Sequence, residues 1–236
     1  MTLSNITTDS VINSDKRFRK IYTQCNKFTM TSIERMYALY KSVEYIINAK
    51  IPGDFVECGV WKGGSTKLIA LTLILLNETT RKIYLYDTYS GMPPPTNKDV
   101  QISNGIKASD LSKRFNNNKN NDIYCYASLK EVKKNLLSTD YPKKNIFFIK
   151  GKLEKTTPNK FHKNIALLHL DVDWYKPTYH GLLHLFPKLA KSGVIVFDDY
   201  GHWLGAKKAI EKYFIETGTK ILLNRTDYTG RIGIKI

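Results

Sequence analysis

Short apolar runs alternate along the chain with segments whose apolar residues are spaced as in a helix. From Thr31 to Ile47 they recur every three or four residues, which predicts a helix that Pro52 ends. Continuous apolar runs bounded by Gly, Pro or Asp predict strands. The predicted strands are residues 54–58, 82–86, 145–151, 165–171 and 193–198, and the other predicted helices are residues 65–76, 128–137, 178–190 and 204–216. Residues 220–224 and 231–236 are predicted to pair as antiparallel strands.

Strands and helices that alternate in this way are typical of an α/β fold. We therefore predict a doubly wound, mostly parallel, seven-stranded sheet with helices on both faces and an antiparallel strand at the C-terminus. Residues 1–30 are polar and weakly patterned, and we expect them to form an N-terminal arm ahead of one domain over residues 31–236. This arm, mobile or in contact with a partner, could form a homodimer contact together with the helix from Thr31.

One long connection interrupts the alternation. Residues 91–121 are rich in Asn, Lys and Ser, and prolines at positions 93–95 keep the start of the segment irregular. A connection of this length is usually a lid, a binding loop or a disordered insert. We predict a lid over the site described below.

The chain is strongly basic. Its 236 residues include 37 Lys and Arg against 21 Asp and Glu, a formal net charge of +16. Such an excess attracts anions, including nucleic acid and acidic glycans. Lys and Asn recur throughout, however, and no basic stripe is interleaved with stacking aromatic residues. A compositional bias explains the charge more simply, and nucleic acid is not an expected partner.

The cysteines and the apolar runs indicate the cellular compartment. Cys25, Cys58 and Cys125 lie far apart, which matches neither a zinc site nor a disulfide framework. The N-terminus has no apolar signal region, and the longest apolar run, residues 68–76, is too short to cross a bilayer. We expect a cytoplasmic protein without a membrane span.

The segment DFVECGVWKGGST, from Asp54 to Thr66, indicates a strand, a glycine turn and the start of a helix. Glycines let the backbone approach a ligand closely, and the first turn of a helix offers unpaired N–H groups. The glycine order fits neither the dinucleotide fingerprint nor the phosphate loop. Glu57, two residues before the first glycine, favours a cationic ligand such as S-adenosylmethionine. Asp87 ends the next strand, where an acid can accept hydrogen bonds from a ribose. A plain tight turn is the alternative.

Two pairs of acids follow two later strands. Asp171 and Asp173 end one strand, and Asp198 and Asp199 end the next. The carboxyl ends of parallel strands meet at one edge of the sheet, where ligands bind. Four carboxylates there would raise one another's pKa values. A divalent cation removes that cost, and Mg²⁺ prefers such oxygen ligands. Helix caps and surface turns are the alternative for either pair alone.

Four sequence blocks, taken in order, resemble the macrocin O-methyltransferase family. They are FVECGVWKGGS from Phe55, DTYSGMP from Asp87, LDVDWY from Leu170 and FDDYG from Phe197, and the resemblance covers about residues 30–217. Members of this family use S-adenosylmethionine to methylate sugar hydroxyls on natural products. The resemblance implies a class I methyltransferase (Rossmann-like) fold and a Mg²⁺-dependent O-methyltransferase. The implied acceptor is a sugar-containing small molecule or a polysaccharide precursor.

The resemblance also implies roles for individual residues. S-adenosylmethionine would be held by Glu57, Gly59, Val60, Trp61, Gly63, Gly64, Ser65, Asp87, Ser90, Ser128, Gly151, Lys152 and Asp171. In this set the glycine turn would hold the methionine part, Asp87 the ribose, and Ser128 and the turn at Gly151 the adenine side. The ligands of Mg²⁺ would be Asp171, Asp198 and Asp199. Asp173 would be the general base.

Two other functions are considered beside this one. Asp171 and Asp173 also form the Asp-x-Asp motif of metal-dependent glycosyltransferases, which leaves the glycine turn unexplained. The second alternative function is a non-catalytic module that binds RNA or glycans through its basic surface. His180 and His184 have metal-ligand spacing, but no third ligand stands out, so packing or surface display is the simpler interpretation. His202 could contact a substrate.

Overall fold

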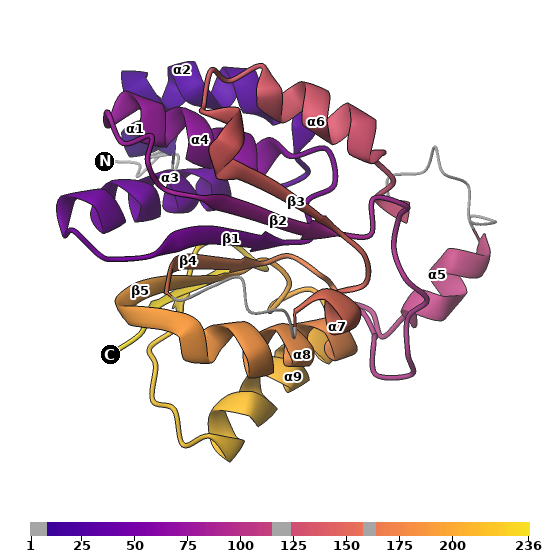
Figure 1. Cartoon of the computed structure of the whole chain (residues 1–236). Helices are drawn as coiled ribbons and strands as arrows, with labels where there is room; N and C mark the ends of the chain where they lie inside the picture. Colours follow the sequence, from indigo (N-terminus) through magenta and orange to yellow (C-terminus); the bar gives the residue numbers. More distant parts are fainter. Residues whose placement is uncertain (1–8, 115–123, 158–163) are drawn as a thin grey trace, which may run out of the picture.

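A seven-stranded sheet with the order β3-β2-β1-β4-β5-β7-β6 runs through the centre of the molecule (Figure 1). The computed structural model describes residues 9–114, 124–157 and 164–236. The strands are β1 (Asp54–Cys58), β2 (Ile83–Asp87), β3 (Ile146–Lys150), β4 (Ile165–Leu170), β5 (Leu189–Phe197), β6 (Asn224–Arg225) and β7 (Arg231–Ile234). Strands β1 to β5 are parallel, whereas β7 pairs antiparallel with both β5 and β6. The predicted mostly parallel, seven-stranded sheet is confirmed.

Helices cover both faces of this sheet (Figure 1). One face carries α1 (Asp9–Ser14), α2 (Lys16–Cys25), α3 (Ile33–Asn48), α4 (Gly64–Leu75) and α6 (Leu129–Leu137), and the other carries α7 (Leu153–Thr156), α8 (Tyr175–Leu185) and α9 (Leu204–Glu216). Short 3₁₀ turns occur at Asn26–Phe28, Lys143–Asn145 and Phe186–Lys188. Each face of the sheet has its own apolar core: the first core lies between the sheet and α3 and α4, and the second lies between the sheet and α8 and α9. Successive residues of β1 point to opposite faces, so Phe55 packs in the first core and Val56 in the second. Helix α5 (Ala108–Arg114) lies beyond the carboxyl edge of the parallel strands.

The helix predicted over residues 178–190 is wrong at both ends. Helix α8 begins at Tyr175, and its first turn is closed by a hydrogen bond from the amide of Thr178 to the carbonyl of Trp174. It ends at Leu185, because the 3₁₀ turn that follows contains Pro187, which has no N–H to donate. Ala190 lies in β5, not in the helix. The first strand of the closing pair, β6, is also shorter than predicted.

Residues 9–28, which we expected to belong to an arm that is mobile or contacts a partner, pack against the domain. Phe18, Ile21 and Cys25 of α2 are buried in the first core. These three residues recur at intervals of three and four, which is the spacing of a helix face. The polar and charged residues between them hid this face in the sequence. Residues 1–8 lie outside the described part of the chain, as do residues 115–121 of the predicted lid.

Replacing Phe18 by Ala should destabilise the protein by about 3–5 kcal/mol, the usual cost of truncating a buried aromatic side chain. Phe18 is fully buried, and its ring lies 4.9 Å from that of Tyr37 and 5.5 Å from that of Tyr40. The free energy of unfolding measured in urea checks this. Val11→Ala, at a position that is 65% exposed, is the control and should change it by less than about 0.5 kcal/mol. Equal effects would mean that α2 is not part of the core.

Within the described residues, no helix has both the length and the apolar character needed to cross a membrane.

Candidate active site

The site lies at β1, where the strand order changes direction: β2 and β3 are added on one side of β1, and β4 and β5 on the other. Strand β1 has β2 on one side and β4 on the other, and open α/β sheets bind ligands at such a switch point. The register pairs Cys58 with Leu170 and Leu170 with Phe197, so these three strands end at the same level. The residues that follow, Gly59, Asp171 and Asp198, therefore meet at one edge. The amide of Asp171 donates to the carbonyl of Cys58 over 2.8 Å.

A cavity opens at this edge and collects most of the residues singled out from the sequence. The predicted residues that line it are Glu57, Gly59, Val60, Trp61, Gly64, Ser65, Asp87, Gly151, Lys152, Asp171, Asp173, Asp198 and Asp199. Three predicted residues are absent from the described lining: Gly63, Ser90 and Ser128. Gly63 precedes α4, and the Ser128 hydroxyl accepts from the amide of Glu131 as the cap of α6. The amide of Ser90 donates to the hydroxyl of Thr88. These three residues shape turns around the cavity.

The glycine turn has a shape that only glycine fits at its first position. Gly59 has φ +83°, and a Cβ there would collide with the backbone carbonyl of Asp171. The carboxylate of Asp87 holds the rest of the turn. It accepts from the amide of Val60 over 2.7 Å and from that of Trp61 over 3.2 Å. Asp87 thus holds the glycine turn in place and also lines the cavity. Its predicted role toward a ribose stays a prediction.

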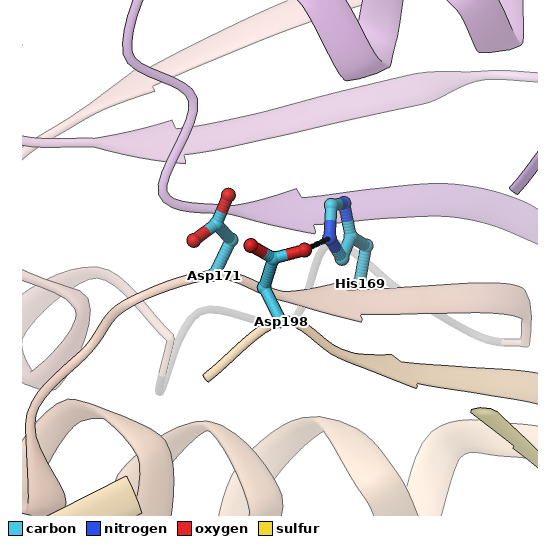
Figure 2. Close-up of side chains that lie close together, drawn as sticks. All are labelled: His169, Asp171 and Asp198. Carbon is cyan, nitrogen blue, oxygen red and sulfur yellow. Dashed lines mark ion pairs between the residues drawn. The ribbon is translucent and has the colours of Figure 1, made fainter. Parts of the chain in front are cut away.

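A buried histidine joins the two groups of acids. His169 in β4 is paired in register with Glu57 in β1, and its Nδ1 lies 3.2 Å from a carboxylate oxygen of Glu57. Its Nε2 lies 3.7 Å from Oδ1 of Asp198, the ion pair drawn in Figure 2. Burial opposes a charge on the imidazole, but Asp198 and Glu57 outweigh it and raise the pKa of His169 to about 10. Glu57 also accepts from the hydroxyl of Thr66. The carboxylate of Glu57 therefore already has two partners inside the protein, His169 and Thr66.

The four predicted acids come together in two overlapping groups, one of which, His169 with Asp171 and Asp198, is drawn in Figure 2. Possible ligand atoms of Asp171, Asp173 and Asp199 lie within 4.8 Å of one another, and so do those of His169, Asp171 and Asp198. Burial raises the pKa values of Asp171 and Asp199 well above the usual value, and the neighbouring carboxylates raise them further. The buried Oδ1 of Asp198 has no hydrogen-bond partner among the described residues. Carboxylate oxygens that repel one another at this distance fit a hard divalent cation.

Arg35, which the sequence did not single out, also reaches this cluster. Its guanidinium pairs with Asp198 and, over 2.9 Å, with Asp227 from the turn before β7. The side chain of Arg35 is only 12% exposed. Arg35 belongs to α3, near one end of the chain, and Asp227 lies near the other end. The ion pair therefore connects α3 to the turn before β7 beside the cavity. No local sequence signal could have indicated this contact.

Asp173, the predicted base, has an unusual backbone conformation. Its φ is +56°, which is uncommon outside glycine and is often found at functional sites. Two contacts hold it in this conformation. The amide of Asp173 donates to Oδ2 of Asp199 over 2.8 Å, and Nε1 of Trp203 donates to Oδ1 of Asp173 over 2.9 Å. Burial raises the pKa of Asp173 to about 6, although the hydrogen bond from Trp203 opposes that rise.

Beside the acids, other polar and apolar side chains line the cavity. His202, Tyr228, Met92 and Pro93 all lie there. Nδ1 of His202 is 3.3 Å from the hydroxyl of Tyr228, and its Nε2 is 3.3 Å from the side-chain nitrogen, Nε2, of Gln101. His202 thus lines the cavity, and its predicted contact with a substrate stays a prediction. His180 and His184 are neither among the lining residues nor in a metal-binding group within the described residues, and their rings pack 4.3 Å apart.

A sheet of this order with its cavity at the switch point is the architecture of class I methyltransferases, which bind S-adenosylmethionine at this place. Residues 3–232 match the family described as Macrocin-O-methyltransferase (TylF), and the chain belongs to that family. It is an S-adenosylmethionine-dependent O-methyltransferase. The glycosyltransferase and the non-catalytic binding module are thereby set aside.

Characterised relatives and solved structures agree with this assignment. The demethyldecarbamoylnovobiocin O-methyltransferase of Streptomyces niveus is 28% identical over 188 residues, which are 80% of this chain and 68% of the relative. The 8-demethyl-8-(2,3-dimethoxy-alpha-L-rhamnosyl)-tetracenomycin-C 4'-O-methyltransferase of Streptomyces olivaceus is 27% identical over 86% of this chain and 73% of its own. The structure of the O-methyltransferase NovP superposes with a TM-score of 0.75 at 26% identity, and covers 88% of this chain and 82% of NovP.

Proposed function

We propose that this protein transfers a methyl group from S-adenosylmethionine to a sugar hydroxyl in a Mg²⁺-dependent reaction. The observation that carries the proposal is the position of the acid cluster in the same cavity as the glycine turn. The activities of two relatives support a sugar acceptor: one acts on a rhamnosyl tetracenomycin, and the other is a mycinamicin III 3''-O-methyltransferase that is 27% identical. The polar side chains around His202 suit an acceptor rich in hydroxyl groups.

The residues of the cavity divide into a donor side and an acceptor side. The backbone of the glycine turn, fixed by Asp87, would hold S-adenosylmethionine with its methyl group toward the acids. Asp173 would take the proton of the acceptor hydroxyl on Oδ2, because Oδ1 already accepts from Trp203. The oxygen then forms a bond to the methyl carbon while the bond from that carbon to sulfur breaks. The positive sulfonium becomes a neutral thioether.

Asp171, Asp198 and Asp199 would hold the metal. When bound there, Mg²⁺ would lower the pKa of the acceptor hydroxyl so that Asp173 can deprotonate it near neutral pH. Arg35 and His169 hold Asp198 in place by pairing with it from two directions. These contacts order the cluster from the protein side.

The proposal is tested by calorimetry and a methyl-transfer assay on the purified full chain. S-adenosylhomocysteine should bind, and nucleotide-linked and glycosidic sugars should be methylated when Mg²⁺ is present. Removing the metal with EDTA should lower turnover at least about tenfold, and added Mg²⁺ should restore it, because charge stabilisation by a metal is worth several kcal/mol. Turnover that is unchanged in EDTA would exclude the metal. Methylation of phenols but of no sugar would exclude the acceptor.

A further inference from the structure

We propose that Trp203 is a positioning residue that aims the carboxylate of Asp173 at the acceptor hydroxyl. This inference rests on the proposed function, in which Asp173 is the base. Trp203 is only 6% exposed and is not among the residues that line the cavity. Its one polar side-chain atom, Nε1, donates to Oδ1 of Asp173 over 2.9 Å. Its ring also packs edge-to-face on His202, with 4.8 Å between centroids. We assign the effect of Trp203 on the chemistry to the hydrogen bond with Asp173.

The hydrogen bond from Trp203 occupies Oδ1 of Asp173. The amide of Asp173 is anchored to Asp199, and the carboxylate of Asp173 also interacts with the Asp199 side chain. The indole N–H further restricts the rotation of the carboxylate because it engages Oδ1. Oδ2 is the oxygen that we assign to the proton of the acceptor. A base must lie within hydrogen-bond reach of the proton that it removes, so losing this orientation should slow the chemical step.

Trp203 can act in this way because it is itself held rigidly. Its amide donates to the carbonyl of Asp199 over 3.0 Å, and its ring packs edge-to-face against Trp174 with 4.9 Å between centroids. Nε1 of Trp174 donates to the carbonyl of Pro93 over 2.9 Å. Trp203 and Trp174 form a small apolar core with Ala108, Ala206, Met92 and Leu111. Residues of the insert after β2 thus support the side chain that orients the base.

The two tryptophans offer a matched pair of variants. Trp203→Phe removes the N–H that donates to Asp173, whereas Trp174→Phe removes an N–H from the same aromatic pair that donates to a backbone carbonyl. We expect Trp203→Phe to lower kcat at least about tenfold, as is usual when a residue that orients a reacting group is lost. The KM for S-adenosylmethionine should stay within about twofold because Trp203 does not line the cavity. A loss of kcat no greater than that of Trp174→Phe would overturn the inference.

Two further variants separate this inference from the proposed function. If Trp203 acts only through Asp173, adding Trp203→Phe to Asp173→Asn should cause no further loss of kcat, and multiplied losses would contradict it. An active Asp173→Asn protein would instead refute Asp173 as the base.

If Trp203→Phe does not fold, 3-benzothienylalanine at position 203 keeps the ring shape and lacks the N–H. Reduced kcat in that protein supports the role of the hydrogen bond, and unchanged kcat refutes it.

Discussion

Asp173→Asn should lower methyl transfer by about 10²- to 10⁴-fold, the range that a general base usually contributes. The amide side chain has almost the same size as the carboxylate but cannot accept the proton. Its oxygen can still accept from Trp203, and its backbone can still donate to Asp199, so the local structure should persist. Asn also tolerates the positive φ of +56° better than most residues do. Turnover at saturating S-adenosylmethionine measures the loss, and calorimetry should show that the cofactor still binds.

Asp140→Asn is a matched control for this variant. Asp140 also has a positive φ, +60°, but it is exposed and lies outside the cavity lining. Its replacement makes the same chemical change in a similar backbone conformation, so turnover should stay close to that of the wild type. If Asp173→Asn retains full activity, the proton must go to another group. If it loses cofactor binding together with turnover, Asp173 has a structural role instead.

The position of the site could be predicted because each part of it depends on a local pattern. Asp171 and Asp198 follow apolar runs that had to be buried strands, and consecutive parallel strands bring such residues to one edge. The glycine turn was visible for the same reason, as a strand followed at once by glycines and a helix. The structure places both in one cavity. Local periodicity and chain order were sufficient for this step.

The contacts that orient the acids could not be predicted in this way. Arg35 lies 163 residues from Asp198 in the chain, and Trp203 lies 30 residues from Asp173. Neither distance corresponds to a period of a helix or strand, so only the packed fold brings these residues together. His169 was more accessible to prediction. Its position opposite Glu57 follows from the strand register, and a polar residue inside an apolar strand should have a buried partner.

Gly59→Ala should lower methyl transfer by about 100-fold, because displacements near 1 Å in an active site can have effects of this size. Two costs arise at this position. Alanine is strained at a φ of +83°, and its Cβ would overlap the carbonyl of Asp171. The second cost matters more, since β1 and β4 would have to separate where the donor side meets the acids. Binding of S-adenosylhomocysteine, measured by calorimetry, should weaken along with turnover.

Gly218→Ala separates these two costs. Gly218 has a similar positive φ, +65°, but a Cβ there would meet nothing within 4 Å. This variant should therefore pay only for the backbone strain, about 1–2 kcal/mol of stability, with cofactor affinity unchanged. If both variants lose stability and only Gly59→Ala loses affinity, the close approach of Gly59 to Asp171 is what joins the donor side to the acid cluster. Equal cofactor affinity in the two variants would show that the turn tolerates a side chain and that cofactor binding does not depend on this contact.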